Sequence, residues 1–270
     1  MGRPAMKTRS SPSKSSKGRR RVGRALVGTS GWSYDHWKGV FYPQRLAKAR
    51  WFAFLAERFP TVEVNATYYR LFPERTFQSW AAKAPRGFVY AVKMWKRVTH
   101  ERRLRDVEEP TAEALTHAAL LGDHLGPILV QLPPGLRRDD GLLAGFLELL
   151  DRLGERADTR FCATVEFRHA SWFDDAVYEL LRRAGVALCL FDSPRLTCPR
   201  VVTAGFVYVR FHGRPKLFAS LYPESALRSW ARWLGEQRDA GRDVFVYFNN
   251  DVEGHAITNA GQLTEMLNRP

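Results

Sequence analysis

The sequence predicts one (β/α)8 barrel of the TIM type. From Ala25 onward, short apolar runs rich in β-branched residues alternate eight times with longer amphipathic stretches, a pattern typical of βα units and a parallel sheet. The 246 residues from Ala25 to Pro270 match the size of one such barrel, which is about 250 residues. An open doubly wound sheet is the alternative. It is disfavoured because Gly28–Trp32 (GTSGW) lacks the glycine spacing of a phosphate-binding turn.

Each apolar run predicts one strand, and its far end is marked by polar or aromatic residues. In chain order, the expected strands are Ala25–Trp32, Thr61–Tyr69, Gly87–Trp95, Gly126–Pro133, Phe161–His169, Gly185–Ser193, Gly205–Gly213 and Asp243–Asp251.

The stretches between the strands predict helices. Apolar residues recur three or four positions apart, for example in Leu142–Leu150 and Leu227–Leu234. Ser171 with Asp174 indicates a capping box at the start of one helix. Three glycines stand where a helix end favours a left-handed residue: Gly154, Gly185 and Gly241. The segment Pro194–Ala204 is too short and too rich in proline to predict a helix.

The composition indicates a soluble, cytoplasmic protein that does not bind a membrane through an apolar segment. With 45% hydrophobic and 26% charged residues, the chain can bury a core without disulfides. No apolar stretch approaches the ~20 residues that cross a bilayer, and no signal peptide is evident. Three cysteines without a close-spaced pair argue against a disulfide framework and against a cysteine zinc site, so we expect them to be packing residues.

The N-terminal residues 1–24 predict a disordered basic arm. They hold nine of the Lys and Arg residues and no Asp or Glu, so the remaining net charge is 14 − 9 = +5. Ser10–Gly18 offers nothing apolar to bury. Such an arm can bind nucleic-acid phosphates or anionic lipid headgroups by charge alone. The alternative is a solubilising extension, or a start codon placed too early, with Met6 as the rival start.

Polar residues at the strand ends predict the functional site, because barrel active sites lie at the C-terminal ends of the strands. Successive side chains of a barrel strand point alternately to the interior and to the helix layer. In each strand we assign the alternate residues that are mostly apolar to the helix layer and the others to the interior. The inward residues are then Glu63, Asn65, Lys93, Gln131, Glu166, Arg168, Asp192, Arg210, His212 and Asn249. The parity of Thr29 is ambiguous. Three acids and three cations in one place indicate a ligand site or, alternatively, a salt-bridge network that closes the barrel.

These residue types suggest acid/base chemistry on an anion. Glu63 and Glu166 can act as acid and base if burial and a neighbouring cation split their pKa values, and His212 is the proton-shuttle candidate. The cations of the set, Lys93, Arg168 and Arg210, suit a phosphate or carboxylate. A Schiff-base role for Lys93 is disfavoured, since nearby acids should keep its amine charged.

A metal site is a weaker hypothesis. His169, Asp192, His212 and Glu166 offer nitrogen and oxygen ligands, but the sequence has no HExxH motif, and three nearby cations would repel a metal. We therefore expect neither a metal nor a cofactor.

Aromatic residues follow several strand ends and predict a rim around the site. Trp32, Tyr34 and Tyr69 are the binding candidates, since flat faces stack on bases or sugars. Packing of the loops onto the barrel is the alternative for each. The other rim aromatics are Trp37, Tyr68, Trp95 and Trp172.

Several motifs in order resemble the YecE-like family, also called domain of unknown function seventy-two. They are Gly28–Tyr34 with Trp37 and Phe41–Pro43, Val62–Tyr69, Thr99-His100, Gln131–Pro134, Glu166–His169 with Ser171-Trp172, Arg210–Gly213 and Tyr247–Asn250. The resemblance runs from about Ala25 to Leu267. It implies a TIM barrel from a bacterial or archaeal cytoplasm, with no established reaction. Its motif residues are those chosen by parity, except for Asp192.

Two features stand apart from that resemblance. Ala66 and Tyr68 occupy positions where the family more often has Ser and Phe, and the basic arm lies outside the family domain. The general barrel shape is similar to that of metal-dependent DNA-repair endonucleases and sugar isomerases, but this chain lacks their rich ligand set, so the similarity is one of fold alone.

The leading functional prediction is an enzyme with hydrolase-like acid/base chemistry. It would bind an anionic ligand, phosphate-bearing or nucleotide-like, at the C-terminal face of the barrel. One alternative is a non-catalytic nucleic-acid-binding protein that uses the basic arm and the aromatic rim. Another is a glycan hydrolase with two carboxylates. The sequence does not define the oligomeric state.

Overall fold

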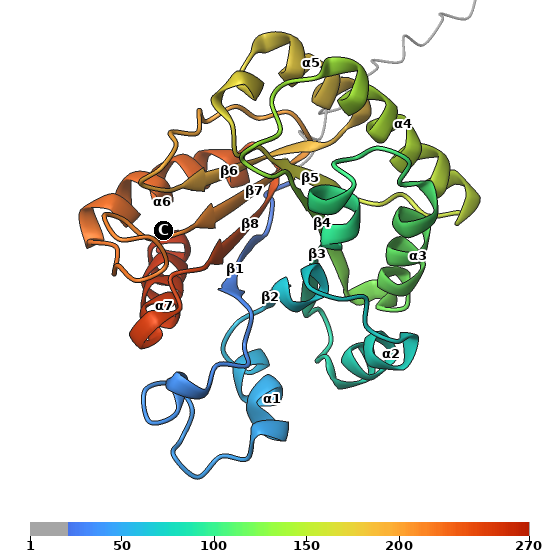
Figure 1. Cartoon of the computed structure of the whole chain (residues 1–270). Helices are drawn as coiled ribbons and strands as arrows, with labels where there is room; N and C mark the ends of the chain where they lie inside the picture. Colours follow the sequence, from blue (N-terminus) through green and yellow to red (C-terminus); the bar gives the residue numbers. More distant parts are fainter. Residues whose placement is uncertain (1–20, 270) are drawn as a thin grey trace, which may run out of the picture.

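Eight parallel strands close into a barrel in the order of the sequence. The computed structural model describes residues 21–269, with the strands at its centre and the helices outside (Figure 1). The strands are β1 (Ala25–Ser30), β2 (Thr61–Val64), β3 (Val89–Lys93), β4 (Leu125–Gln131), β5 (Ala163–Glu166), β6 (Ala187–Asp192), β7 (Phe206–Phe211) and β8 (Asp243–Phe248). The predicted fold class and all eight strands are confirmed, although the strands end earlier than expected; β2, for example, ends at Val64 because a 3-10 turn (Asn65–Tyr68) begins there.

Seven α-helices lie along the described chain. They are α1 (Trp51–Ala56), α2 (Glu74–Lys83), α3 (Glu108–Ala119), α4 (Asp140–Arg156), α5 (Asp175–Ala184), α6 (Glu224–Asp239) and α7 (His255–Asn268). As expected, no helix forms in Pro194–Ala204, between β6 and β7. None of the helices within residues 21–269 is long and apolar enough to span a membrane.

The helix ends correct one prediction and refine another. Asp174 itself caps α5, with its side chain accepting a hydrogen bond from the backbone N–H of Ala176, while Ser171 lies in a preceding 3-10 turn; the predicted capping box is wrong. Gly185 ends α5 with a φ of 66°, as predicted, and Gly241 has a φ of 89°. Gly154 lies inside α4 and is not a helix end.

Two apolar clusters fill the two sides of the sheet. The larger one packs outward-facing strand residues, such as Val62 and Val209, against the helices. The smaller one lies inside the barrel and comprises Leu26, Val89, Ala91, Leu129, Cys189, Tyr208, Phe245 and Tyr247. Gly28 on β1 is required by a close approach, because a Cβ there would lie 2.1 Å from the backbone oxygen of Thr61.

The chain approaches β1 along the N-terminal end of the barrel. Arg21 and Arg24 form ion pairs with Asp243 at 3.2 and 2.7 Å, and the backbone N–H of Gly23 donates to the backbone oxygen of Arg238. Three of the last four residues of the expected arm, Arg21, Gly23 and Arg24, therefore contact the barrel. Its first twenty residues lie outside the described residues.

Candidate functional site

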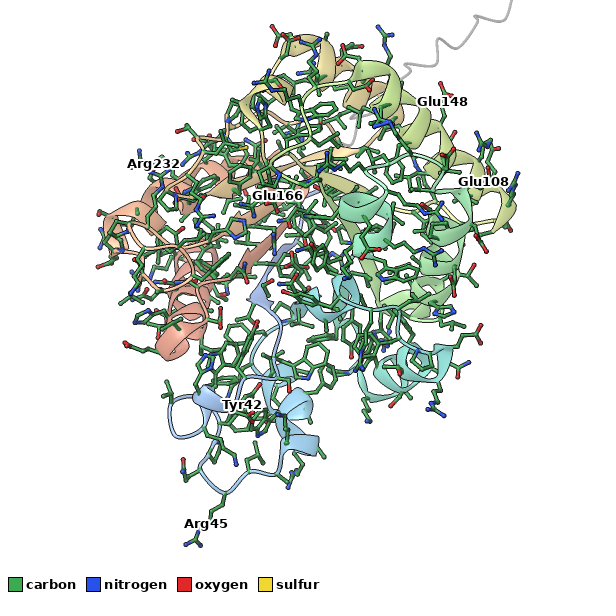
Figure 2. The ribbon with its side chains drawn as sticks, in the orientation of Figure 1. Tyr42, Arg45, Glu108, Glu148, Glu166 and Arg232 are labelled. Atoms are coloured by element: carbon green, nitrogen blue, oxygen red, sulfur yellow. The ribbon has the colours of Figure 1, made fainter. Side chains whose placement is uncertain are left out.

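A buried guanidinium joins two buried carboxylates at the C-terminal end of the barrel. Arg210 lies near the end of β7, and its two terminal nitrogens reach carboxylate oxygens of Glu63 on β2 and Glu166 on β5, each at 2.7 Å. The side chain of Arg210 is 1% exposed and both carboxylates are fully buried. Figure 2 shows Glu166 in the middle of the molecule, whereas Glu148 and Arg232 lie at its periphery.

Both carboxylates are held ionised by their surroundings. Burial alone raises the pKa of Glu63, but the charge of Arg210 and hydrogen bonds from Ser30, Tyr208 and Arg210 bring it below its usual value. The hydroxyl of Tyr208 donates to Glu63 at 2.6 Å. The pKa of Glu166 is likewise held well below its usual range, against burial, chiefly by Arg168 and Arg210. The split of the two pKa values that acid and base roles require is therefore absent.

The second oxygen of Glu166 contacts the rest of the cluster. Gln131 at the end of β4 donates to it at 2.9 Å, and Arg168 forms an ion pair with it. Nε2 of His212 lies 3.4 Å from the same oxygen. This oxygen of Glu166 thereby brings together side chains from β4, from the residues after β5 and from the residues after β7.

His212 is neutral and has a defined orientation. Burial lowers its pKa to about 4, against the opposing charge of Glu166. Arg168 donates to its Nε2 at 2.9 Å, and a guanidinium can only donate, so the ring proton is on Nδ1. The amide nitrogen of Asn249 is placed 3.2 Å from Nδ1, so in this tautomer the amide group is turned over and its oxygen accepts the proton.

Lys93 at the end of β3 differs from the two arginines. Its side chain is buried, with the residue 7% exposed, and its Nζ lies 4.2 Å from the centroid of the Tyr68 ring. No carboxylate of residues 21–269 lies within 4 Å of this amine. Burial and the charge of Arg210 lower its pKa to about 7, and Glu166 and Glu63 only partly oppose them. The expectation that nearby acids keep this amine charged is therefore wrong, because both acids are already paired with arginines.

Asp192 does not join this cluster. It shares the parity of Leu188 and Leu190, which face the helix layer, whereas Cys189 faces the interior. Its carboxylate lies 3.0 Å from Arg214 and accepts from the hydroxyl of Tyr222 at 3.0 Å. The inward assignment of Asp192 by parity is wrong.

Phe191 contributes the inward side chain of β6 instead. The guanidinium carbon of Arg168 lies 5.2 Å from the centroid of its ring. The ring of His212 lies 6.1 Å from the same ring. Phe191 therefore gives this side of the cluster an apolar wall.

The aromatic rim is mostly packed against the barrel. Trp37 and Trp172 are fully buried, and Trp32 packs on Phe52 and Trp80 with ring centroids 5.7 and 5.9 Å away. The hydroxyl of Tyr34 donates to the backbone oxygen of Ser30 at 2.5 Å. Tyr69, in contrast, is 68% exposed. These positions favour packing roles for most of the rim.

Several buried polar atoms of the cluster have no hydrogen-bond partner. Within the described residues they include Oδ1 of Asn65, Nε of Arg210 and Nε of Arg168, although the last atom is ion-paired with Glu166. Such atoms are rare in folded proteins, and they indicate places where water or a ligand completes the bonding.

The residues do not form a metal cluster. Residues 21–269 contain no group of three or more His, Cys, Asp or Glu side chains placed to hold a metal ion. Nδ1 of His169 contacts the hydroxyl of Ser171 at 2.8 Å, and Asp192 pairs with Arg214, so the four ligand candidates do not converge.

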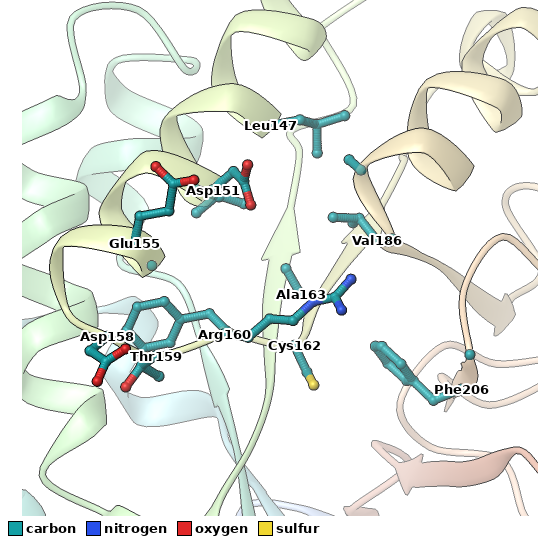
Figure 3. A pocket seen from close by; sticks show the side chains of 16 residues that line it. Leu147, Asp151, Glu155, Asp158, Thr159, Arg160, Cys162, Ala163, Val186 and Phe206 are labelled. Atoms are coloured by element: carbon teal, nitrogen blue, oxygen red, sulfur yellow. The ribbon is translucent and has the colours of Figure 1, made fainter.

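A separate cavity of about 640 Å³ opens at the opposite end of the barrel, where β5 to β7 begin. Figure 3 shows Asp151 and Glu155 of α4 on one side and Phe206 on the other, with Arg160 and Cys162 between them. Cys162 is exposed and precedes β5, so its predicted packing role inside a strand is wrong; Cys189 is buried as predicted. None of the predicted site residues lines this cavity.

Known proteins share both the sequence and the fold. Residues 26–270 match the model of a family described as protein of unknown function DUF72. The chain belongs to the DUF72 family. A DUF72 protein of known structure from Thermotoga maritima MSB8 is 30% identical, with a TM-score of 0.80 over 91% of this chain and 100% of the other.

Other DUF72 relatives are more distant. The UPF0759 protein YunF of Bacillus subtilis (strain 168) is 27% identical over 89% of this chain and 94% of its own length. A DUF72 protein from Enterococcus faecalis V583 is 20% identical, with a TM-score of 0.77 over 91% of this chain and 96% of the other, which supports the fold alone. The resemblance inferred from the motifs is thus confirmed.

Sequence reasoning missed several members of this DUF72 site. Ser30, Tyr208 and Phe191 all face it, and so does His100, whose ring centroid lies 4.9 Å from that of the predicted rim residue Tyr68. Tyr208 shares the parity of Arg210, and Ser30 shares that of Leu26, so the alternation could have found both. The other predicted members brought together are Glu63, Lys93, Gln131, Glu166, Arg168, Arg210, His212 and Asn249.

Proposed function

We propose that this DUF72 protein is an enzyme that binds a small anionic ligand, phosphate-bearing or nucleotide-like, at the C-terminal face of its barrel. The observation that carries the proposal is the charge balance of the buried cluster. Lys93, Arg168 and Arg210 bring three positive charges, whereas Glu63 and Glu166 bring two negative charges. With Lys93 protonated, one positive charge is left over; because the pKa of Lys93 is about 7, this holds for about half of the molecules at pH 7, and a bound anion would favour the protonated form.

An unmatched charge inside a protein is costly unless a partner arrives. Asp192 does not supply that partner, because it is paired with Arg214 outside the cluster. A bound anion supplies it, and Arg168, whose side chain is 19% exposed, is the arginine that such an anion can reach. Asn65, directly after β2, adds an acceptor without a partner, which can take a hydrogen bond from a hydroxyl or amino group of the ligand and not from the anion itself.

The pKa values assign different chemical roles to these residues from those that the residue types alone predict. Glu63 and Glu166 stay ionised and hold Arg168 and Arg210 in place, so we assign them as positioning residues. Lys93, with a pKa of about 7, is the group that can take up and release a proton near neutral pH. Neutral His212 is available as an acceptor only if its contact with Arg168 is broken.

The alternatives receive less support. A two-carboxylate glycan hydrolase needs one carboxylic acid that keeps its proton near neutral pH, and the pKa values of both Glu63 and Glu166 are lowered. Stacking on nucleic-acid bases needs exposed aromatic faces, and only Tyr69 among the rim candidates within residues 21–269 is exposed.

The test is the melting temperature of the full chain with inorganic phosphate, sugar phosphates, nucleotides and neutral sugars. A ligand at 100 times its Kd adds about 2.7 kcal/mol, which raises the Tm by roughly 5–10 °C for a domain of this size. We expect a rise with a phosphate-bearing ligand that is lost in Lys93→Met and retained in Lys48→Met. Lys48 is the matched control because it is exposed and paired with Asp35 at 3.0 Å.

Two results would overturn the proposal. One is the absence of any rise with every anion of the panel. The other is a rise that persists unchanged in Lys93→Met and in Arg168→Met, because binding would then occur elsewhere. The rise in Tm should also be measured in Arg160→Met, which alters the cavity at the opposite end of the barrel and leaves the proposed site intact. A rise that is lost in this variant would show that the anion binds in that cavity.

A further inference from the structure

We infer that Lys93 forms a Schiff base with an aldehyde or ketone that carries an anionic group. The inference deepens the proposed function and rests on it, because the anion site brings the carbonyl to the amine. It also names a substrate class, namely anionic carbonyl compounds such as 2-oxo acids and phosphorylated aldehydes.

The position of Lys93 is the first step. It is the last residue of β3, paired in register with Leu129 of β4, and it shares the inward parity of Val89 and Ala91. Its amine therefore lies at the C-terminal end of the barrel interior, next to the arginine cluster. Active-site groups of such barrels occupy this place.

The lack of a carboxylate partner is the second step. A buried lysine with a purely structural role is normally paired with a carboxylate. Here both nearby carboxylates are occupied, Glu63 by Arg210 and Glu166 by Arg210 and Arg168. The contact found for Nζ is the face of Tyr68 at 4.2 Å, which accommodates the amine without supplying an acceptor oxygen.

The electrostatic surroundings are the third step. A lysine becomes a nucleophile when it loses its proton, and burial beside other cations is the means by which proteins achieve this. The charged and titratable groups around Lys93 come from several elements: Glu63 on β2, Tyr68 after β2, His100 after β3, Glu166 and Arg168 at the end of β5, and Arg210 on β7. Two arginines and burial outweigh the two acids, and the pKa of about 7 is consistent with this balance.

The chemical step is balanced without an outside oxidant or reductant. The neutral amine attacks the carbonyl carbon, and the electron pair of the C=O bond moves to oxygen. One proton passes from the nitrogen to this oxygen to give the carbinolamine. A second proton, taken back from solvent in place of the one that the ammonium released, allows the hydroxyl to leave as water while the nitrogen lone pair forms the C=N bond. Overall, ammonium and carbonyl give iminium and water. The iminium retains one positive charge, so the anionic group of the substrate stays matched by Arg168 and the cluster.

The experiment traps the imine in the unaltered full chain. The protein is incubated at pH 7 with pyruvate and cyanoborohydride, which delivers hydride to the iminium carbon, and the labelled lysine is located by peptide mapping. At pH 7 an amine with a pKa of about 7 is half neutral, whereas an ordinary lysine near 10.4 is neutral in roughly one molecule in 2,500. We expect at least about 100-fold more label on Lys93 than on exposed Lys48.

Three further arms define the result. Acetone replaces pyruvate to remove the anionic group, and we expect its label on Lys93 to fall at least about 10-fold, as a lost charge contact predicts. The amount of label on Lys93 should increase as the pH is raised, with a midpoint near pH 7. In Lys93→Arg the positive charge persists while the label disappears; this variant supports the assignment but is not needed for it, because the main readout uses the native chain.

The outcomes separate this inference from the proposed function. If Lys93 takes no more label than Lys48, the Schiff base is excluded, while a phosphate-dependent rise in Tm still supports the anion site. If acetone and pyruvate label Lys93 equally, the amine is reactive but the anionic substrate class is wrong. The inference stands if pyruvate labels Lys93 selectively and inorganic phosphate competes with it.

Discussion

Nη1 of Arg210 lies 2.7 Å from Oε2 of Glu166, and through this contact β7 is tied to β5 across the barrel interior. The other terminal nitrogen of Arg210 binds Glu63 at the same distance. One guanidinium thus compensates two carboxylates that are fully shielded from water.

Replacement of Arg210 by methionine should strongly destabilise the fold. It leaves two buried carboxylates without their shared cation, and removing one partner of a buried pair costs about 3–5 kcal/mol. The free energy of unfolding in urea measures this cost. Arg228→Met is the control, because Arg228 is exposed and pairs with Glu224 within one helix, and a solvent-exposed pair of this kind contributes little to stability. Equal losses in both variants would contradict the assignment.

Replacement of Lys93 by methionine should give a pH-dependent gain in stability. The pKa of Lys93 is lowered to about 7 in the folded state, so between about pH 7 and 10.4 the unfolded chain binds more protons than the native one. The stability of the native protein therefore rises with pH across this window, by at most about 1.4 kcal/mol per pH unit. Lys93→Met removes this slope.

The measurement compares unfolding in urea at pH 7 and pH 9. We expect the free energy of unfolding of Lys93→Met to exceed that of the native protein by more at pH 7 than at pH 9. The free energy of unfolding of Lys48→Met should equal that of the native protein at both pH values. If the difference in free energy of unfolding between Lys93→Met and the native protein is the same at both pH values, the pKa of the buried amine is not lowered.

Removal of the Tyr208 hydroxyl should destabilise the fold more than removal of an ordinary buried tyrosine hydroxyl. Tyr208 donates to ionised Glu63, and a hydrogen bond to a charged group is worth about 1.5–3 kcal/mol. Tyr90 donates to the neutral backbone oxygen of Trp80 at 3.0 Å, so Tyr90→Phe should cost about 1 kcal/mol. Unfolding of Tyr208→Phe and Tyr90→Phe at pH 7 makes the comparison. A larger loss in Tyr90→Phe would refute the ionised state of Glu63.

Two glycine-to-alanine changes should act in opposite directions. At Gly28 the new Cβ meets the backbone oxygen of Thr61 at 2.1 Å, so β1 and β2 must separate, and we expect a loss of about 1–3 kcal/mol. At Gly145, which is exposed within α4, the Cβ meets nothing within 4 Å, and helix propensity predicts a gain of about 1 kcal/mol. Thermal unfolding followed by circular dichroism distinguishes the two; a stabilised Gly28→Ala would show that the β1–β2 spacing is wrong.

The strands and most of the site were predictable because both depend on alternation. Apolar runs located all eight strands, and the period of two placed Glu63, Glu166 and Arg210 on one side of the sheet. The same rule failed at Asp192, since a polar residue at the end of a strand can satisfy itself outside the barrel, as this one does with Arg214 and Tyr222.

Charge states were less predictable than positions. From residue types alone, Glu63 and Glu166 are candidates for acid and base, and Lys93 is expected to be charged. The pairing pattern decides otherwise, because the arginines take both carboxylates and leave the lysine amine without one. Two of the three ion pairs join distant parts of the chain, because Glu63 and Arg210 are separated by 147 positions and Glu166 and Arg210 by 44. Local sequence patterns do not carry this information.

The shared guanidinium also limits how the barrel can be divided. Glu63 belongs to the first four strands, whereas Arg210 and Glu166 belong to the last four. A fragment that contains only β1 to β4 would have to bury a carboxylate whose counter-ion lies on the missing part of the chain. The two halves therefore depend on each other electrostatically, and closure of the barrel is the event that neutralises its interior.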